Sequence, residues 1–133
     1  MAIGPPTGWI ALAAIPVAAV LGATLRRVRG SPLLTRMRPH AALGLTALAV
    51  GCVHAMWSMR ALAAADGRGV WLGSAALLAF VVQGFVGASL WDPGAYRGAL
   101  RRWHAAVFWS LLLLALGHVV FAAPYFQGMT GAS

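Results

Sequence analysis

Four long apolar stretches follow one another along the chain, separated by short polar segments. They cover approximately residues 8–25, 39–62, 70–90 and 102–123. An α-helix needs roughly 20 such residues to cross the hydrocarbon core of a bilayer. The intervening segments carry turn signals such as Asp66-Gly67 and Asp92-Pro93-Gly94. The pattern therefore predicts four membrane-spanning helices joined by short loops.

Three prolines bear on the limits of these helices. We expect Pro16 to bend the first helix, because proline removes one intrahelical hydrogen bond. Pro39 is expected in the first turn of the second helix, and Pro124 is expected to end the fourth. Short loops place consecutive helices antiparallel. The predicted fold is an all-α, up-down-up-down membrane four-helix bundle in a single transmembrane domain, residues 1–133.

Composition agrees with a membrane protein. Of 133 residues, 61% are hydrophobic and 9% are charged, whereas soluble domains carry about a quarter charged residues. The net charge of +8 comes from ten arginines set against Asp66 and Asp92. A basic soluble protein would suggest nucleic acid as a partner. Here the arginines lie between apolar stretches, so we expect a membrane and no nucleic acid.

The arginines also predict an orientation. Eight of the ten lie in the first and third connecting regions, and only Arg60 and Arg68 lie in the second. The positive-inside rule then places both chain termini outside. The first stretch has no positive charge before it, so it is expected to be a retained helix and not a signal peptide. We expect an integral protein of a bacterial inner (plasma) membrane.

All four histidines lie in the second and fourth stretches. His40 and His54 are fourteen residues apart, and so are His104 and His118. Fourteen residues make four turns at 3.5 residues per turn, so both imidazoles of a helix lie on one face, about 21 Å apart along its axis. The second and fourth helices are parallel in the predicted bundle. His40 should therefore meet His104, the inner pair, and His54 should meet His118, the outer pair.

Two matched histidine pairs are the ligand set that two stacked haems require. His40 and His104 could instead be interfacial residues beside arginines. His54 and His118 lie inside apolar stretches, where polar side chains are costly and usually functional. The sequence has one cysteine, Cys52, and no CxxCH motif, so the haems would be held without a covalent link. We expect two haem b groups, an inner one on His40/His104 and an outer one on His54/His118.

Glycines repeat the same spacing on the other two helices. Gly8 and Gly22 are fourteen apart, as are Gly73 and Gly87. Without a side chain, glycine allows a porphyrin plane to approach the backbone, although small residues also serve helix–helix packing in membranes. Gly22, Gly73 and Gly87 are the better candidates for cofactor binding, because Gly8 is expected at the edge of its helix.

Haem propionates need cationic partners, and arginine suits carboxylates. Arg36, Arg38, Arg101 and Arg102 flank the inner ligands, and Arg60 lies six residues beyond His54. The positive-inside rule alone would also place the inner ones there. Arg38 and Arg60 are the predicted propionate partners.

The phrases RPHAALGLTALAVGCVHAMW and ALRRWHAAVFWSLLLLALGH, with the glycine pairs, resemble the di-haem b-type core of two families. These are cytochrome b of the respiratory bc complexes and the ferric-reductase-like transmembrane domains, which include NADPH oxidases. The resemblance covers about residues 8–124. It implies a four-helix bundle with two haems between the second and fourth helices, and the inner-histidine-first order is closer to the ferric-reductase-like group.

The sequence holds no flavin or nicotinamide domain and no loop for a quinol-oxidation site. We therefore expect an electron-transfer cytochrome with no catalytic residue, linking a quinol or cytoplasmic donor to an acceptor or redox partner protein on the other face. Three alternatives stay open. They are a haem-bearing anchor subunit of a respiratory or dehydrogenase complex, a small oxidoreductase acting on quinone, superoxide or ferric chelates, and a cofactor-free structural subunit.

Overall fold

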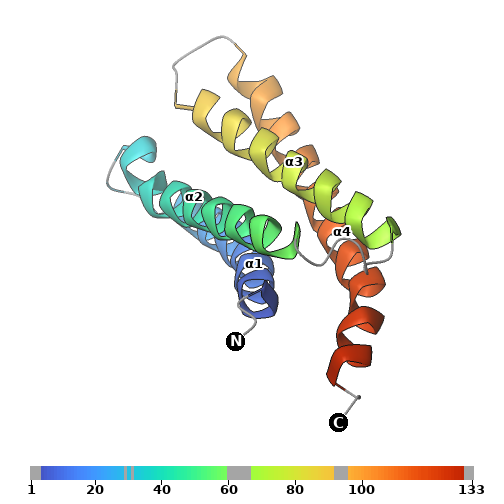
Figure 1. The fold of residues 1–133 in the computed structure, drawn as a ribbon. Coiled ribbons are helices and arrows are strands. Elements are labelled where there is room, and N and C mark those ends of the chain that lie inside the picture. Colours follow the sequence, from blue (N-terminus) through green and yellow to red (C-terminus); the bar gives the residue numbers. More distant parts are fainter. Residues whose placement is uncertain (1–3, 29, 31, 60–66, 92–95, 131–133) are drawn as a thin grey trace.

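The computed structural model describes residues 4–28, 30, 32–59, 67–91 and 96–130. They form four helices, α1 (Gly4–Arg27), α2 (Leu33–Ser58), α3 (Gly67–Ser89) and α4 (Arg97–Thr130), and the described residues contain no strand (Figure 1). The expected all-α fold and the order of its four helices are confirmed.

All four helices are long and apolar enough to cross a membrane. Large apolar side chains cover their outer surfaces, among them Phe85, Leu113 and Val120, which are 71%, 69% and 66% exposed. Apolar surface on this scale has no favourable contact in water and suits lipid. The chain has the make-up of an integral membrane protein.

The start of α2 corrects the sequence-based expectation. Pro39 is not in the first turn, because α2 begins at Leu33, six residues earlier. Pro32 is the N-cap with an extended backbone (φ −54°, ψ 137°), and its carbonyl accepts a bond from the Arg36 N–H at 3.2 Å. Pro39 leaves one intrahelical acceptor without its donor, and membrane helices tolerate this where neighbouring groups compensate. As a result Arg36 and Arg38 lie on the helix and not in a connector.

The end of α4 is a second correction. Pro124 does not end the helix, which continues to Thr130. The same tolerance of proline in membrane helices applies here. Pro16 lies inside α1 without ending it. The predicted turn at Asp66-Gly67 falls partly outside the described residues, and Gly67 is the first residue of α3.

The helices pack as two hairpins. α1 lies along α2 and α3 lies along α4, while α2 contacts α3 over a shorter stretch. In Figure 1 the end of α1, the beginning of α2, the end of α3 and the beginning of α4 lie toward one end of the molecule. The beginning of α1 and the end of α4 lie toward the other. This is the expected up-down-up-down order.

A layer of apolar residues lies at the middle of the bundle. Among the described residues, Leu111, Ala47 and Ile15 are the least exposed, at 2%, 3% and 6%. Phe80 packs against the cluster that contains Ile15 and Leu111. Ile15, Ala47, Phe80 and Leu111 each lie halfway along the fourteen-residue interval of their own helix. Each is seven positions from both glycines (α1, α3) or both histidines (α2, α4) of that helix. The bundle therefore alternates in depth between a polar level, an apolar level and a second polar level.

Candidate functional site

The structure brings the four histidines together in two pairs between α2 and α4. The ring centroids of His40 and His104 are 6.2 Å apart, with an angle of 72° between the ring planes. The centroids of His54 and His118 are also 6.2 Å apart, with an angle of 74°. Two sites of nearly identical geometry thus lie at two levels of the bundle.

This separation suits one metal atom between two imidazoles. Metal–imidazole bonds are about 2 Å long, so two opposed nitrogens lie about 4 Å apart. In a ring with bonds of about 1.3 Å, each nitrogen is about 1 Å from the ring centre. The expected distance between the ring centroids is about 6 Å. The centroid separation of both pairs matches the distance expected for one metal atom bound by a nitrogen of each histidine.

Hydrogen bonds fix the tautomer of one histidine in each pair. His40 Nδ1 lies 2.8 Å from the Ala18 carbonyl oxygen on α1, and His118 Nδ1 lies 2.7 Å from the Gly69 carbonyl oxygen on α3. A carbonyl only accepts, so each Nδ1 carries the proton and donates it. Nε2 is then the nitrogen with the free electron pair. Metal-ligating histidines are commonly oriented by such a bond from the other ring nitrogen.

The four glycines contact the imidazoles, each within its own hairpin. A Cβ at Gly8 would lie 2.8 Å from a His54 ring atom, one at Gly22 2.9 Å from His40, and one at Gly73 2.8 Å from His118. At Gly87 the nearest His104 atom would be 3.4 Å away. Glycine is thus required at three of the four positions for the ring to take its place.

This arrangement refines the expectation about the glycines. Gly8 does not lie at the edge of its helix, because α1 begins at Gly4, and its contact is as close as that of Gly73. Gly87, expected to be among the better candidates, makes the loosest contact of the four. The side chain that approaches each glycine backbone is a histidine.

The other two histidines have different partners. His54 Nδ1 lies 3.5 Å from Thr7 Oγ1. His104 Nε2 lies 3.3 Å from Gln83 Nε2 on α3, while its Nδ1 is buried without a hydrogen-bond partner among the described residues. No sequence pattern singles out Gln83, since a lone glutamine in an apolar helix has no characteristic spacing.

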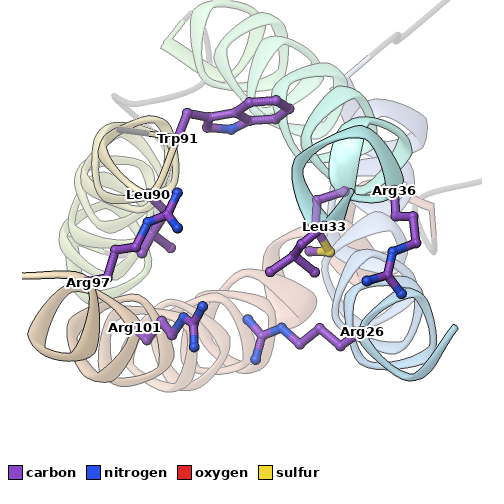
Figure 2. Close-up of a pocket in the computed structure, with 8 residues that line it drawn as sticks. Arg26, Leu33, Arg36, Leu90, Trp91, Arg97 and Arg101 are labelled. Atoms are coloured by element: carbon purple, nitrogen blue, oxygen red, sulfur yellow. The ribbon is translucent and has the colours of Figure 1, made fainter. Parts of the chain in front are cut away.

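A cavity of about 370 Å³ lies between the hairpins at the arginine-rich end, lined by residues from or next to every helix. Figure 2 shows the Arg26 and Arg101 side chains directed toward each other across it, with Arg97 nearby and Trp91 at its rim. Arg36 also lines the cavity, and its Nη1 donates to the Leu25 carbonyl at 3.3 Å. No acidic residue is among those that line the cavity: Arg26, Leu33, Arg36, Met37, Leu90, Trp91, Arg97, Arg101.

The cavity lies next to the inner histidine pair. Four of its lining residues lie three or four positions, about one helical turn, from a histidine or glycine of the inner level. These are Arg26 near Gly22, Arg36 near His40, Trp91 near Gly87 and Arg101 near His104. Cationic groups therefore lie one turn beyond the level of His40 and His104.

The structure describes one of the two predicted propionate partners. Arg38 does not line the cavity, and Arg60 lies outside the described residues. Arg26 and Arg97 were missed by the sequence analysis. One available signal was helical periodicity, since Arg26 follows Gly22 by one turn as Arg101 precedes His104.

Among the described residues, no three histidine, cysteine or acidic side chains converge as a site for a metal ion. The histidines meet two by two. Comparisons with protein-family models, curated proteins and solved structures give no match.

Proposed function

We propose that this chain is a di-haem b-type cytochrome that carries electrons across a membrane. The observation that supports this best is the pair of matched histidine sites, each with ring centroids 6.2 Å apart between α2 and α4. The sites lie at two levels, fourteen residues apart on both helices. That arrangement suits two cofactors in series along the membrane normal.

The residues present fit two axially ligated haems. His40 and His118 have an oriented ring with Nε2 left for a metal. Gly8, Gly22 and Gly73 leave room for the rings where a Cβ would collide with them. Two protein ligands per site suffice because a porphyrin supplies the remaining four nitrogens. Held by His40 with His104 and by His54 with His118, haem b would supply a one-electron redox couple suited to electron transfer.

The chain's own residues hold and insulate the two sites. The helices bring the four imidazoles to their positions, and backbone carbonyls orient two of them. The apolar level formed by Ile15, Ala47, Phe80 and Leu111 lies between the sites and keeps water out of the interval. Isolation of this kind favours transfer between the two sites over loss of electrons to solvent.

The arginine-lined cavity supports a specific placement of the inner haem. Arg26 and Arg101 face each other across the cavity (Figure 2), one helical turn from the inner pair. Two guanidinium groups in that arrangement repel each other unless an anion lies between them. The propionates of the inner haem supply such carboxylates, and charge-assisted bonds would hold them there. We therefore assign this role to Arg26 and Arg101 in place of Arg38.

The donor is proposed to be a quinol or a cytoplasmic protein, and the acceptor a partner on the other face. The arginine-rich end carries the inner pair, so the positive-inside rule places that pair nearer the cytoplasm. Electrons entering there would pass to His54/His118 and leave on the opposite side.

Haem content tests the proposal directly. Protein produced with ample haem and purified in detergent should contain two non-covalent b haems per chain, both low-spin and six-coordinate. The measurement is pyridine haemochrome content against protein mass, with electron paramagnetic resonance for the spin state. A reproducible value of one haem or none per chain would exclude the di-haem assignment.

A pair of matched variants tests the assignment of ligands to sites. His118→Ala should remove the outer haem alone, and His104→Ala the inner haem alone, because the two sites are about 21 Å apart along the helices. In membranes, the His118→Ala protein should still have its remaining haem reduced by the donor while the acceptor receives almost nothing. Normal acceptor turnover after verified loss of the outer haem would contradict a serial path.

A further inference from the structure

The four histidines differ in how their second ring nitrogen is satisfied. His40 and His118 each donate from Nδ1 to a backbone carbonyl of the neighbouring helix, at 2.8 and 2.7 Å. His104 Nδ1 is buried and has no hydrogen-bond partner among the described residues. A bond from Nδ1 to an acceptor orients the ring and raises the basicity of the ligating nitrogen. His104 is therefore the more weakly supported ligand of the inner pair.

Gln83 engages His104 at the nitrogen that a metal would use. Gln83 Nε2 lies 3.3 Å from His104 Nε2, and an amide nitrogen only donates. His104 Nε2 must then be the acceptor with the free electron pair. Gln83 Oε1 is also buried without a partner in the described part of the chain, so no other bond holds the amide in this position.

The space around His104 is also looser. A Cβ at Gly87 would approach the ring only to 3.4 Å, whereas one at Gly22 or Gly73 would come within 2.9 or 2.8 Å of its histidine. The His104 ring is thus less closely confined by its neighbouring helix than His40 or His118. Three independent features, the orphaned Nδ1, the amide at Nε2 and the wider glycine contact, concern the same residue.

We propose that His104 is the exchangeable ligand of the inner site, and that Gln83 holds its Nε2 when it leaves the metal. The position that His104 vacates would then be open to a small exogenous ligand. The inference rests on the proposed di-haem function. In the exchange, the bond from iron to His104 Nε2 breaks and a bond from iron to the incoming ligand forms. The oxidation state of the iron stays the same, and the freed Nε2 accepts the Gln83 N–H.

Two bonds determine how readily His104 would leave the metal. They are the hydrogen bond that is missing at its Nδ1 and the hydrogen bond that Gln83 donates to its Nε2. Loss of such an outer contact typically weakens metal binding by about 10- to 100-fold. One ordinary hydrogen bond shifts an equilibrium by about three- to tenfold. Gln83 should therefore favour the released state of His104 by about three- to tenfold. This adds to the weaker metal binding that results from the missing hydrogen bond at Nδ1.

Carbon monoxide is the probe. The purified di-haem protein is reduced with dithionite and titrated with carbon monoxide, with haem content measured in the same sample. We expect about one carbon monoxide bound per two haems. Fewer than two haems per chain would count against the proposed function itself. Two haems with no carbon monoxide bound, or with two bound, would overturn the exchangeable ligand at His104.

Variants on one helix connect the binding to His104. Gln83→Leu keeps a side chain of similar size in an apolar helix but cannot donate, so the apparent affinity for carbon monoxide should fall by about three- to tenfold. Ser89→Ala, also on α3, removes an exposed hydroxyl that bonds only to its own helix and should leave the affinity unchanged. Equal affinity in wild type and Gln83→Leu would refute the role of Gln83. His104→Ala protein that retains only the outer haem should bind no carbon monoxide. If it still binds one carbon monoxide per chain, the binding is at the outer site and the proposal is refuted.

Discussion

Replacing Gly73 by alanine tests whether the glycines exist to accommodate histidine rings. The added Cβ would lie 2.8 Å from His118 Nδ1 and 2.9 Å from Cε1. That same nitrogen donates to the Gly69 carbonyl at 2.7 Å. The ring cannot keep both its position and its hydrogen bond, so the substitution should disturb the outer site and the packing of α3 on α4.

The expected effect can be estimated from its parts. Overpacking of a tight contact costs about 1–3 kcal/mol, and the lost hydrogen bond adds about 0.5–1.5 kcal/mol. Alanine gains up to about 1 kcal/mol over glycine inside a helix. With the full alanine gain subtracted, the net loss of stability should be about 0.5–3.5 kcal/mol. Gly87→Ala, with its contact at 3.4 Å, should lose less.

Gly44→Ala is the matched control, because a Cβ at Gly44 of α2 has no neighbour within 4 Å. It should be neutral or more stable by up to about 1 kcal/mol. The measurement is the free energy of unfolding in mixed micelles, followed by helical circular dichroism, together with the spectrum of the outer haem. If Gly73→Ala is as stable as Gly44→Ala and keeps an unaltered outer haem, the tight contact has no role and the reasoning fails.

Two further predictions concern the arginines. Arg26→Gln and Arg101→Gln should each lower the midpoint potential of the inner haem by on the order of a few tens of millivolts, since a nearby cation favours the reduced state. The control substitutions are at the neighbouring residues Arg27 and Arg102, which do not line the cavity between the hairpins. Equal shifts in a spectroelectrochemical titration would contradict the assignment of Arg26 and Arg101. A reporter fused after Ser133 should be active on the exterior side, because eight of the ten arginines lie within residues 26–38 or 97–102. Activity confined to the cytoplasm would reverse the names of the two sites.

Much of the helical framework follows from the sequence alone. Apolar stretches of membrane length predict helices because the backbone must satisfy its own hydrogen bonds in lipid. The fourteen-residue interval, read at 3.5 residues per turn, predicts which histidines share a level, and the structure places His40 with His104 and His54 with His118. Both inferences depend on helical periodicity, which is a local property.

Helix limits were less predictable. Pro39 and Pro124 suggest a start and a stop, yet both lie inside helices. Proline is a strong signal where water competes for the freed carbonyl, and a weaker one in an apolar bundle where neighbouring groups replace the lost bond. The proline rule for soluble helices therefore placed the predicted start of α2 and the predicted end of α4 inside the observed helices.

The details of the site depend on packing between helices. The contact of Gln83 with His104, and the meeting of Arg26 with Arg101 across a cavity, each join two different helices. Such contacts depend on the rotation and tilt of one helix against another. No spacing within a single stretch records these quantities. The sequence therefore predicted which histidines pair, but it did not predict the contacts of Gln83 and Arg26.

The apolar level between the two histidine pairs has an electrical consequence. The pairs are about 21 Å apart along the helices, within a hydrocarbon core of about 30 Å, so roughly two-thirds of the membrane voltage falls between them. A charge crossing the whole voltage gains or loses about 2.3 kcal/mol per 100 mV, and an electron moving between the pairs about 1.6 kcal/mol. At 100 mV that energy changes the ratio of electrons on the two sites by about fifteenfold. In the proposed di-haem arrangement, the membrane voltage would therefore shift the distribution of an electron between the two sides of the bundle.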